Sequence, residues 1–179
     1  MTALKLSSKQ YFDEAYAKYL AAHPDVNIYA LPKIEKVVVN VGIGKLDKAQ
    51  KDEVADQVER LTGQIPRKIN SRISIAGFKM RAGEFVGVSV TLRGQKMRDF
   101  LFNTVYLALP RTKDFKGVSA KAFDSNFAAY SLGIPDSSIY PQIGFSSKFN
   151  FGMQVTISFK SQTEANKELL KTLSFPFKK

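Results

Sequence analysis

Cysteine is absent from this sequence of 179 residues, and histidine occurs only once. Without cysteine the chain has no disulfides, no thiolate metal ligands and no cysteine nucleophile. The single histidine, His23, stands beside Pro24 at the end of a predicted helix, where a solvated or capping role is favoured over metal binding. No serine has a histidine partner nearby that would build a catalytic triad. We therefore expect no metal site and no cofactor.

Long hydrophobic runs are also missing. The longest mostly apolar stretch, residues 100–109, is interrupted by Asn103 and Thr104. It is too short to span a bilayer, which takes about 20 residues. The N-terminus lacks the apolar segment that follows the first charges of a signal peptide. These absences predict a cytoplasmic protein with no membrane contact.

Acidic residues are scarce relative to basic ones: 16 Asp and Glu stand against 27 Lys and Arg, and the formal net charge is +11. The excess lies in one block, because residues 60–121 contain 13 Lys or Arg and only 3 Asp or Glu. A solvated surface is the ordinary explanation of a charge run. A block this lopsided in an otherwise nearly neutral chain favours contact with phosphate groups.

The hydrophobic residues, 44% of the sequence, are sufficient to form a core. No repeat or linker divides the chain, so we expect a single domain covering residues 1–179. Helical periodicity predicts helices over residues 8–22, 48–62 and 95–108, and a last one opened by a capping box at 161–164. Asp47 is the expected N-cap and Gly63 the expected stop of the second helix. Period-two alternation predicts strands over residues 34–41, 67–70, 85–92, 129–132 and 153–159.

Three of these strands share one design. In residues 34–41, Val37, Val39 and Val41 point one way, while Lys36 and Asn40 point the other. The strands at 85–92 and 153–159 likewise place aliphatic residues opposite hydroxyls and amides. This order of elements predicts an α+β fold with a mainly antiparallel sheet, helices packed on the aliphatic face, and an open polar face.

The segment VGIGK at 41–45 follows a strand and precedes a helix, as a phosphate-binding loop does. It matches neither phosphate motif, because Leu46 follows the lysine and Asp47 stands where a dinucleotide fingerprint needs its third glycine. The acidic residues of the 48–62 helix are typical of a solvated helix face. We therefore expect a protein that is not an enzyme.

An open sheet face of hydroxyls, amides and lysines beside a basic block suits RNA. Several short motifs then resemble, in order, bacterial large-subunit ribosomal protein five, the 5S rRNA-binding family. The resemblance runs from about residue 31 to the C-terminus, through VNVGIG (39–44), TGQ (62–64), AGFK (76–79), VTLRG (90–94), PR (110–111), DF (114–115), SAK (119–121), FD (123–124), YS (130–131) and FPFKK (175–179).

The resemblance implies a structural constituent of the large ribosomal subunit that anchors 5S rRNA in the central protuberance. The family's RNA-contacting positions fall on Lys36, Asn40, Gln64 and Thr91, and alternation alone already places Lys36 and Asn40 on the open face. Ser89 and Arg93 complete the expected 5S rRNA-binding set. The implied partners are 5S rRNA, 23S rRNA, P-site tRNA, a small-subunit head protein and neighbouring large-subunit proteins.

Two further regions follow from the resemblance. A long basic loop at 67–83 is expected to contact P-site tRNA, through Arg72, Ser74, Gly77, Phe78, Lys79 and Arg81. Phe78 has two open roles, packing against its own fold, which is favoured, or stacking on a nucleotide. A bridge to the small subunit is expected over 110–146, through Arg111, Lys113, Lys116 and Gln142.

The chain departs from the family pattern in both regions. Asn70 and Ile73 stand where lysine is usual in the loop, which predicts a weaker or differently built tRNA contact. Residues 125–129 replace a glycine-rich stretch, and Gln142, Gly144 and Ser146 stand where acidic residues are common, so the charges of the bridge differ. A free-standing RNA chaperone and a scaffold for acidic proteins remain the alternatives, and selective binding of 5S rRNA separates the ribosomal role from both.

Overall fold

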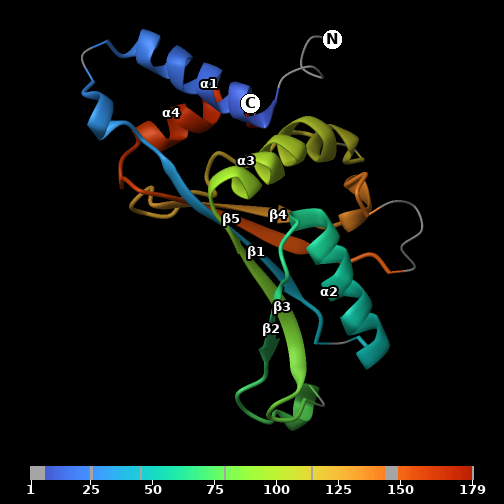
Figure 1. Cartoon of the computed structure of the whole chain (residues 1–179). Helices are drawn as coiled ribbons and strands as arrows, with labels where there is room; N and C mark the ends of the chain where they lie inside the picture. The colour runs from blue at the N-terminus through green and yellow to red at the C-terminus, as the bar shows by residue number, and fades with distance from the viewer. Residues whose placement is uncertain are drawn as a thin grey trace.

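The strands of the chain form one antiparallel sheet in the order β2-β3-β1-β5-β4. A computed structural model describes residues 7–24, 26–44, 46–78, 80–113, 115–143 and 149–178. The strands are β1 (Ile34–Gly42), β2 (Arg67–Asn70), β3 (Phe85–Leu92), β4 (Ala129–Ile134) and β5 (Met153–Phe159). The α-helices are α1 (Ser8–Ala22), α2 (Lys48–Thr62), α3 (Gly94–Asn103) and α4 (Ala165–Thr172). Figure 1 shows their arrangement.

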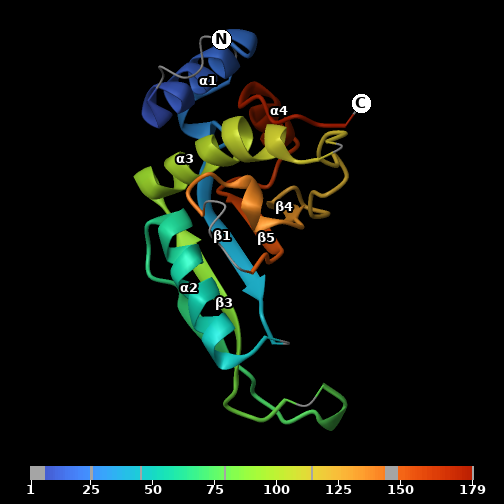
Figure 2. The ribbon, with the colours of Figure 1, turned by 90° about the vertical axis from the view of Figure 1, so that its right-hand side faces the viewer.

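The core lies on one face of this sheet. The side chains of Val37, Val39 and Val41 in β1 are completely buried, and β3 and β5 bury their alternate residues in the same way. Burial of each such side chain contributes about 1.5–3 kcal/mol, which fixes the face that each strand turns inward. Helix α2 packs against β3 and α3 against β1, while α1 packs on α3 and α4. Figure 2 shows α2 and α3 together on one side of the sheet. The predicted α+β architecture is confirmed.

The termini of α2 agree with the sequence prediction. Asp47 is its N-cap, and the backbone N–H of Asp47 donates to the Gln50 side chain at 3.1 Å. Gly63 ends the helix in the left-handed region at a φ of 65°, where any residue with a Cβ would be strained.

The last helix begins later than predicted. Ser161 does not cap it, because α4 starts at Ala165 with Glu164 before it. The cause is Asn166, whose side chain is fully buried and takes the local hydrogen bonds. Its amide donates to the carbonyls of Ser161 and Phe127 at 2.7 and 2.8 Å, and its oxygen accepts from the Ser161 hydroxyl at 3.0 Å. Residues 161–164 are therefore held as a loop.

The predicted helix over 95–108 is not regular to its end. The α-helix stops at Asn103, and a π-helical stretch (Thr104–Ala108) and a 3-10 turn (Leu109–Arg111) containing Pro110 follow it. Thr104 is fully buried, and its hydroxyl donates to the Phe100 carbonyl at 2.8 Å and lies 3.0 Å from the Tyr140 hydroxyl. A threonine that bonds back into the preceding turn competes with regular helix geometry.

Strand β4 extends two residues beyond the predicted 129–132.

Candidate nucleic-acid interface

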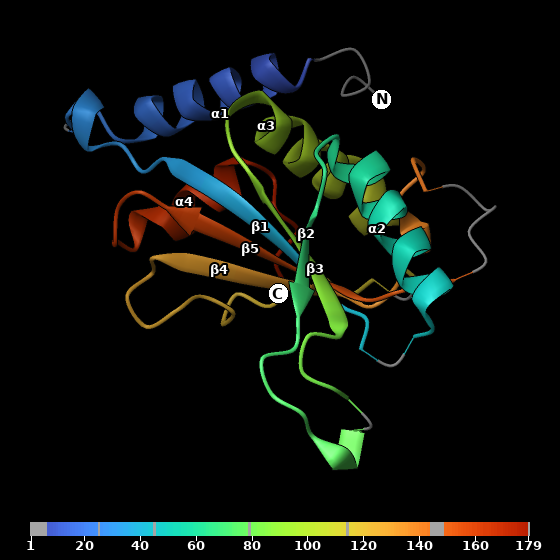
Figure 3. The ribbon, with the colours of Figure 1, turned by 60° about the horizontal axis from the view of Figure 1, so that its bottom comes forward.

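The face of the sheet opposite the core is lined with polar residues. In Figure 3 the strands lie in front of α3, and α2 lies to the right of β2 and β3. The side chains of Asn40, Thr91 and Gln154 are exposed on it, and those of Lys36 and Ser89 are partly exposed. The expected open polar face is therefore present.

Cross-strand register assembles these residues into rows. Asn40 of β1 lies between Ser89 of β3 and Gln154 of β5, which are its direct partners on either side. The next row places Val38 between Thr91 and Thr156 in the same way. Directly opposed residues in antiparallel strands have their Cβ atoms about 4.5–5.5 Å apart. Amides and hydroxyls from three strands thus form one continuous polar surface.

Lys36 lies at one end of this surface, beside a β-bulge. The pairing of β1 with β5 shifts by one residue between Ile34 and Lys36, so that Glu35 is the additional residue. Glu35 is therefore exposed, and its carboxylate accepts from the Arg93 guanidinium at 2.9 Å. That hydrogen bond holds the pKa of Glu35 below its ordinary value. Arg93 thus lies at the same end as Lys36, with its charge offset by Glu35.

Gln64 joins the polar surface from outside the sheet. It follows Gly63, the C-cap of α2, and its side-chain amide donates to the Thr91 carbonyl at 3.3 Å. The predicted residues Lys36, Asn40, Gln64, Ser89 and Thr91 thus come together on one face, although they are spread over 56 positions of the sequence.

β5 contributes residues that were not among the predicted site residues. Gln154 is exposed opposite Asn40, Thr156 lies opposite Val38, and Ser158 lies opposite Lys36. Their alternation with buried aliphatics was visible in the sequence, but the neighbour of β5 in the sheet was not. The pairing with β1 is what makes them part of the surface.

The β2–β3 connection, residues 71–84, extends from the end of the sheet away from the helices (Figure 1). It is internally bonded: Ile75 and Met80 exchange two backbone hydrogen bonds of 3.0 and 3.2 Å, and Ser71 N–H donates to the Glu84 carbonyl at 2.8 Å. The Ser74 hydroxyl accepts from the Ala82 backbone N–H at 2.9 Å. The connection is therefore a bonded extension of the hairpin.

Of the predicted loop residues, Arg72, Ser74, Gly77 and Arg81 are exposed along this extension. The Arg72 and Arg81 side chains have no ion-pair partner within the described part of the chain. Lys79 lies outside the described residues, as does the side chain of Phe78. Asn70 and Ile73, which replace usual lysines, are also exposed.

A buried lysine anchors the base of the extension. Lys51 of α2 is only 4% exposed, and its ammonium donates to the Glu84 carboxylate at 3.0 Å. The second Glu84 oxygen accepts from the Arg81 backbone N–H at 3.2 Å. The Lys51 hydrogen bond is the main cause that lowers the pKa of Glu84, and the Arg81 bond adds to it.

The predicted bridge residues lie away from the sheet face. Arg111 belongs to the 3-10 turn after α3, and Lys113 and Lys116 are exposed in the loop that follows. Gln142 is exposed in the turn after Tyr140, whereas Gly144 and Ser146 lie outside the described residues. These side chains are separate from the polar surface.

His23 is the C-cap residue of α1, which agrees with the predicted capping role. Its ring stacks on Tyr19, and Nε2 lies 3.2 Å from the Glu168 carboxylate. Within the residues that the structure describes, no cluster of three or more His, Cys, Asp or Glu side chains is placed to hold a metal ion. Nor is any helix in those ranges long and apolar enough to cross a membrane.

Comparison with known proteins identifies similar chains along almost the whole sequence. The family model described as ribosomal protein L5 matches residues 27–81, and the model for the C-terminal part of the same ribosomal family matches residues 85–177. The large ribosomal subunit protein uL5 of Halothermothrix orenii is 38% identical over 97% of this chain and 99% of its own length. That of Syntrophomonas wolfei is 42% identical over 85% of this chain and 87% of its own. The uL5c protein of Arabidopsis thaliana is 44% identical over 86% of this chain and 60% of its own.

Proposed function

The chain belongs to the ribosomal protein L5 family and is a structural constituent of the large ribosomal subunit, and from this premise we propose that its open sheet face binds 5S rRNA. Members of the family are structural rather than enzymatic, and this one is a component of the cytoplasmic ribosome. The proposed role is to anchor 5S rRNA in the central protuberance.

The observation that carries the proposal is the row Ser89–Asn40–Gln154 with Thr91 and Gln64 beside it. Amides and hydroxyls both donate and accept, so they can bond ribose hydroxyls and phosphate oxygens together. Because the strands are hydrogen-bonded in fixed register, the groups keep their spacing before RNA arrives. A rigid array of this kind selects the shape of a folded RNA rather than a base sequence.

Charge supports the same face. Lys36 lies on it and is partly exposed, and no ion pair to its side chain is present within the residues that the structure describes. Arg67 of β2 is the partner of Ser89 and extends the Asn40 row by one strand. Its side chain is exposed and has no ion-pair partner in the described ranges. Two cations thus flank a neutral hydrogen-bonding strip.

The hairpin extension is proposed to contact P-site tRNA. It projects away from the sheet and carries Arg72 and Arg81, whose side chains bind no carboxylate within the residues that the structure describes. Asn70 and Ile73 in place of lysines leave fewer phosphate contacts, so this binding is expected to be weak.

The region 110–146 is proposed to form a bridge to a small-subunit head protein. The contacting residues are Arg111, Lys113, Lys116 and Gln142. The remaining proposed partners are 23S rRNA and neighbouring large-subunit proteins.

The test is a titration of the purified protein with 5S rRNA and with an unrelated structured RNA of similar length, at low and at physiological salt. A preference for 5S rRNA that persists at the higher salt supports the proposal, because shape-specific hydrogen bonds survive screening. Equal binding that collapses with salt contradicts it and favours a general RNA chaperone. Binding to neither RNA favours a scaffold for acidic proteins.

A further inference from the structure

β4 is the last strand of the sheet, and one of its edges faces away from β5. The Phe159 N–H donates to the Ala128 carbonyl at 2.9 Å, so Ala128 and Phe159 form a hydrogen-bonded pair of the two strands. In antiparallel strands such pairs alternate with pairs that are not hydrogen-bonded to each other. The backbone groups of Ala129, Ser131 and Gly133 consequently point away from β5. An edge of this kind is a template for a further strand.

The first part of that edge is already occupied by the chain itself. Asp124 N–H donates to the Ala129 carbonyl at 2.9 Å, and Ser131 N–H donates to the Ala122 carbonyl at 3.0 Å. The chain then turns away before reaching Gly133. The N–H and C=O of Gly133 form no hydrogen bond within the described residues, and Gly133 is exposed.

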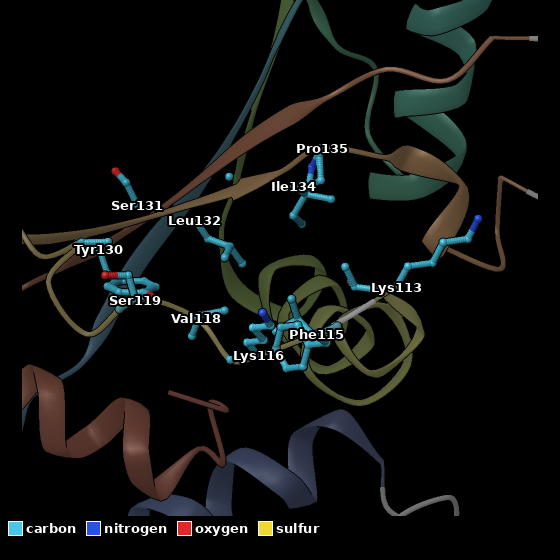
Figure 4. A pocket seen from close by; sticks show the side chains of 15 residues that line it. Lys113, Phe115, Lys116, Val118, Ser119, Tyr130, Ser131, Leu132, Ile134 and Pro135 are labelled. Atoms are coloured by element: carbon cyan, nitrogen blue, oxygen red, sulfur yellow. Dashed lines mark hydrogen bonds between the residues drawn. The ribbon is translucent and has the colours of Figure 1, made fainter. Parts of the chain in front are cut away.

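A cleft with a volume of about 480 Å³ adjoins these free groups. Its lining comes from β4 on one side and from the loop after α3 on the other: Leu109, Thr112, Lys113, Phe115–Ser119, Ala122 and Tyr130–Pro135. Figure 4 shows Leu132 and Ile134 on the strand side and Val118, Phe115 and Lys116 facing them. The volume falls within the range of about 300–1,000 Å³ that is usual for ligand sites.

The loop wall of this cleft is held in place by the C-terminal residues. Val118 N–H donates to the Pro176 carbonyl and Lys178 N–H donates to the Val118 carbonyl, both at 2.8 Å. A Cβ at Gly117 would lie 2.7 Å from the Lys178 nitrogen, so the two segments are in close contact. The cleft is therefore a fixed feature of the fold rather than a gap beside a loose loop.

The cleft is positively charged. Lys113 and Lys116 are exposed on its lining, and neither has an ion-pair partner in the part of the chain that the structure describes. The Asp136 carboxylate, next to the lining residue Pro135, accepts from the Ser138 N–H at 2.8 Å and does not belong to the lining. An incoming chain therefore meets two cations above an apolar floor.

We propose that an extended acidic segment of another protein binds in this cleft as an additional strand beside β4. Its backbone pairs with the N–H and C=O of Gly133, and its acidic side chains lie against Lys113 and Lys116. Its alternate apolar side chains lie toward Phe115. The same lysines oppose pairing with the β4 edge of a second copy, because like charges would be brought together. This site is distinct from the proposed RNA-binding face, but it uses Lys113 and Lys116, which are also proposed for the small-subunit bridge, and so it rests on that part of the proposed function.

The test uses the full-length protein and short fluorescent peptides, followed by anisotropy. One peptide alternates Glu and Val, a second alternates Lys and Val, and a third alternates Glu and Pro and so cannot pair as a strand. The Glu–Val peptide is expected to bind about tenfold or more tightly than either of the others. Equal binding of the two Glu peptides would indicate attraction by charge alone and would overturn the proposal, as would a failure of all three to bind.

Substitutions locate the site. Gly133→Pro removes the free N–H, whereas Gly133→Ala keeps it and places its Cβ in open space. Glu–Val binding should weaken about tenfold in the proline variant and stay unchanged in the alanine variant. Lys113→Glu with Lys116→Glu should abolish it, while the charge-matched pair Lys18→Glu with Lys171→Glu, on exposed helix positions, should not. If circular dichroism shows that the Gly133→Pro variant does not fold, hydrogen exchange of the Gly133 amide in the wild-type protein is measured instead. Exchange should be slower when the Glu–Val peptide is bound. An exchange rate that the peptide does not change would overturn the proposal.

Discussion

Asn40 and Gln154 lie directly opposite each other across the β1–β5 pair, and both side chains are exposed on the same face of the sheet. They are 114 positions apart in the sequence. Two amides at this spacing provide four N–H donors and two acceptor oxygens within reach of one nucleotide backbone segment. The proposed RNA-binding surface is therefore centred on β1 and receives side chains from the strands on both of its sides.

Replacing Asn40 and Thr91 together by alanine should weaken 5S rRNA binding about tenfold or more, since each removes side-chain hydrogen bonds worth roughly 0.5–1.5 kcal/mol. Lys178→Ala, at an exposed position outside the surface, is the control. Affinities are measured by filter binding or anisotropy with 5S rRNA. If the double variant and the control bind equally well, the site is not on this face.

Gln154→Ala tests whether β5 takes part. Because Gln154 is the direct partner of Asn40, its loss should reduce 5S rRNA affinity about threefold to tenfold. Gln162→Ala, an exposed glutamine in the loop before α4, should leave the affinity unchanged. Both variants replace a glutamine by alanine. If they change the affinity for 5S rRNA equally, β5 does not take part and the surface is restricted to β1 and β3.

The loop arginines should contribute charge without selectivity. Arg72→Ala with Arg81→Ala removes two phosphate contacts, and the slope of log K against log salt for tRNA binding should fall by about 1.5. The preference of the protein for 5S rRNA over other RNAs should be retained. A slope identical to that of the wild type would show that the extension does not contact phosphates.

The Lys51–Glu84 pair should order the extension. Lys51→Met keeps the apolar stem but removes the donor, so the pKa of Glu84 should rise toward its ordinary value of 4.5. The amides of Ser71 and Gly83 should then exchange faster with solvent. Lys48→Met, at an exposed position of the same helix, is the control. Carboxyl NMR titration and amide exchange measure both effects.

The same pair makes the order of the extension depend on pH. The folded protein holds the pKa of Glu84 below 4.5, so the stabilisation is complete above that pH. It is lost as the pH falls through the lowered pKa. Amide exchange at Ser71 that is independent of pH through this acid range, after correction for its intrinsic rate, would show that the pair does not hold the base of the extension.

Asn166→Ala should destabilise the fold by about 2–3 kcal/mol, because the carbonyls of Ser161 and Phe127 lose a buried donor. The exposed Asn150 offers a matched control, whose replacement by alanine should change the free energy of unfolding by less than about 0.5 kcal/mol. Urea denaturation compares the two. Similar midpoints for both variants would contradict the role given to Asn166.

Period-two alternation was sufficient to predict which face of each long strand is buried. Val37, Val39 and Val41 are buried as expected, and Lys36 and Asn40 lie on the other face. This works because burial acts on each side chain according to its position along one strand. The helix ends at Asp47 and Gly63 were predictable for the same reason, since caps depend on residues close in sequence.

Features that depend on distant residues were not predictable. Ser161-x-x-Glu164 has the form of a capping box, yet Asn166 takes the hydrogen bonds of Ser161 once Phe127 lies nearby. Strand order is equally non-local, so the place of Gln154 beside Asn40 could not be inferred from alternation. The free edge of β4 was invisible for the same reason, because an edge is defined only by which strands are missing beside it.

The position of β1 in the middle of the sheet has a consequence for how the chain is made. One of its neighbours, β3, follows within about 50 residues, but the other, β5, is completed only at Phe159. Contacts between distant segments form slowly, because a long loop must close before they are made. During synthesis the nascent chain therefore carries a central strand with one unpaired side until its last strand has emerged. The proposed RNA-binding surface is complete only after β5 has been made, so a chain terminated before β5 has no complete docking face with which to compete for RNA.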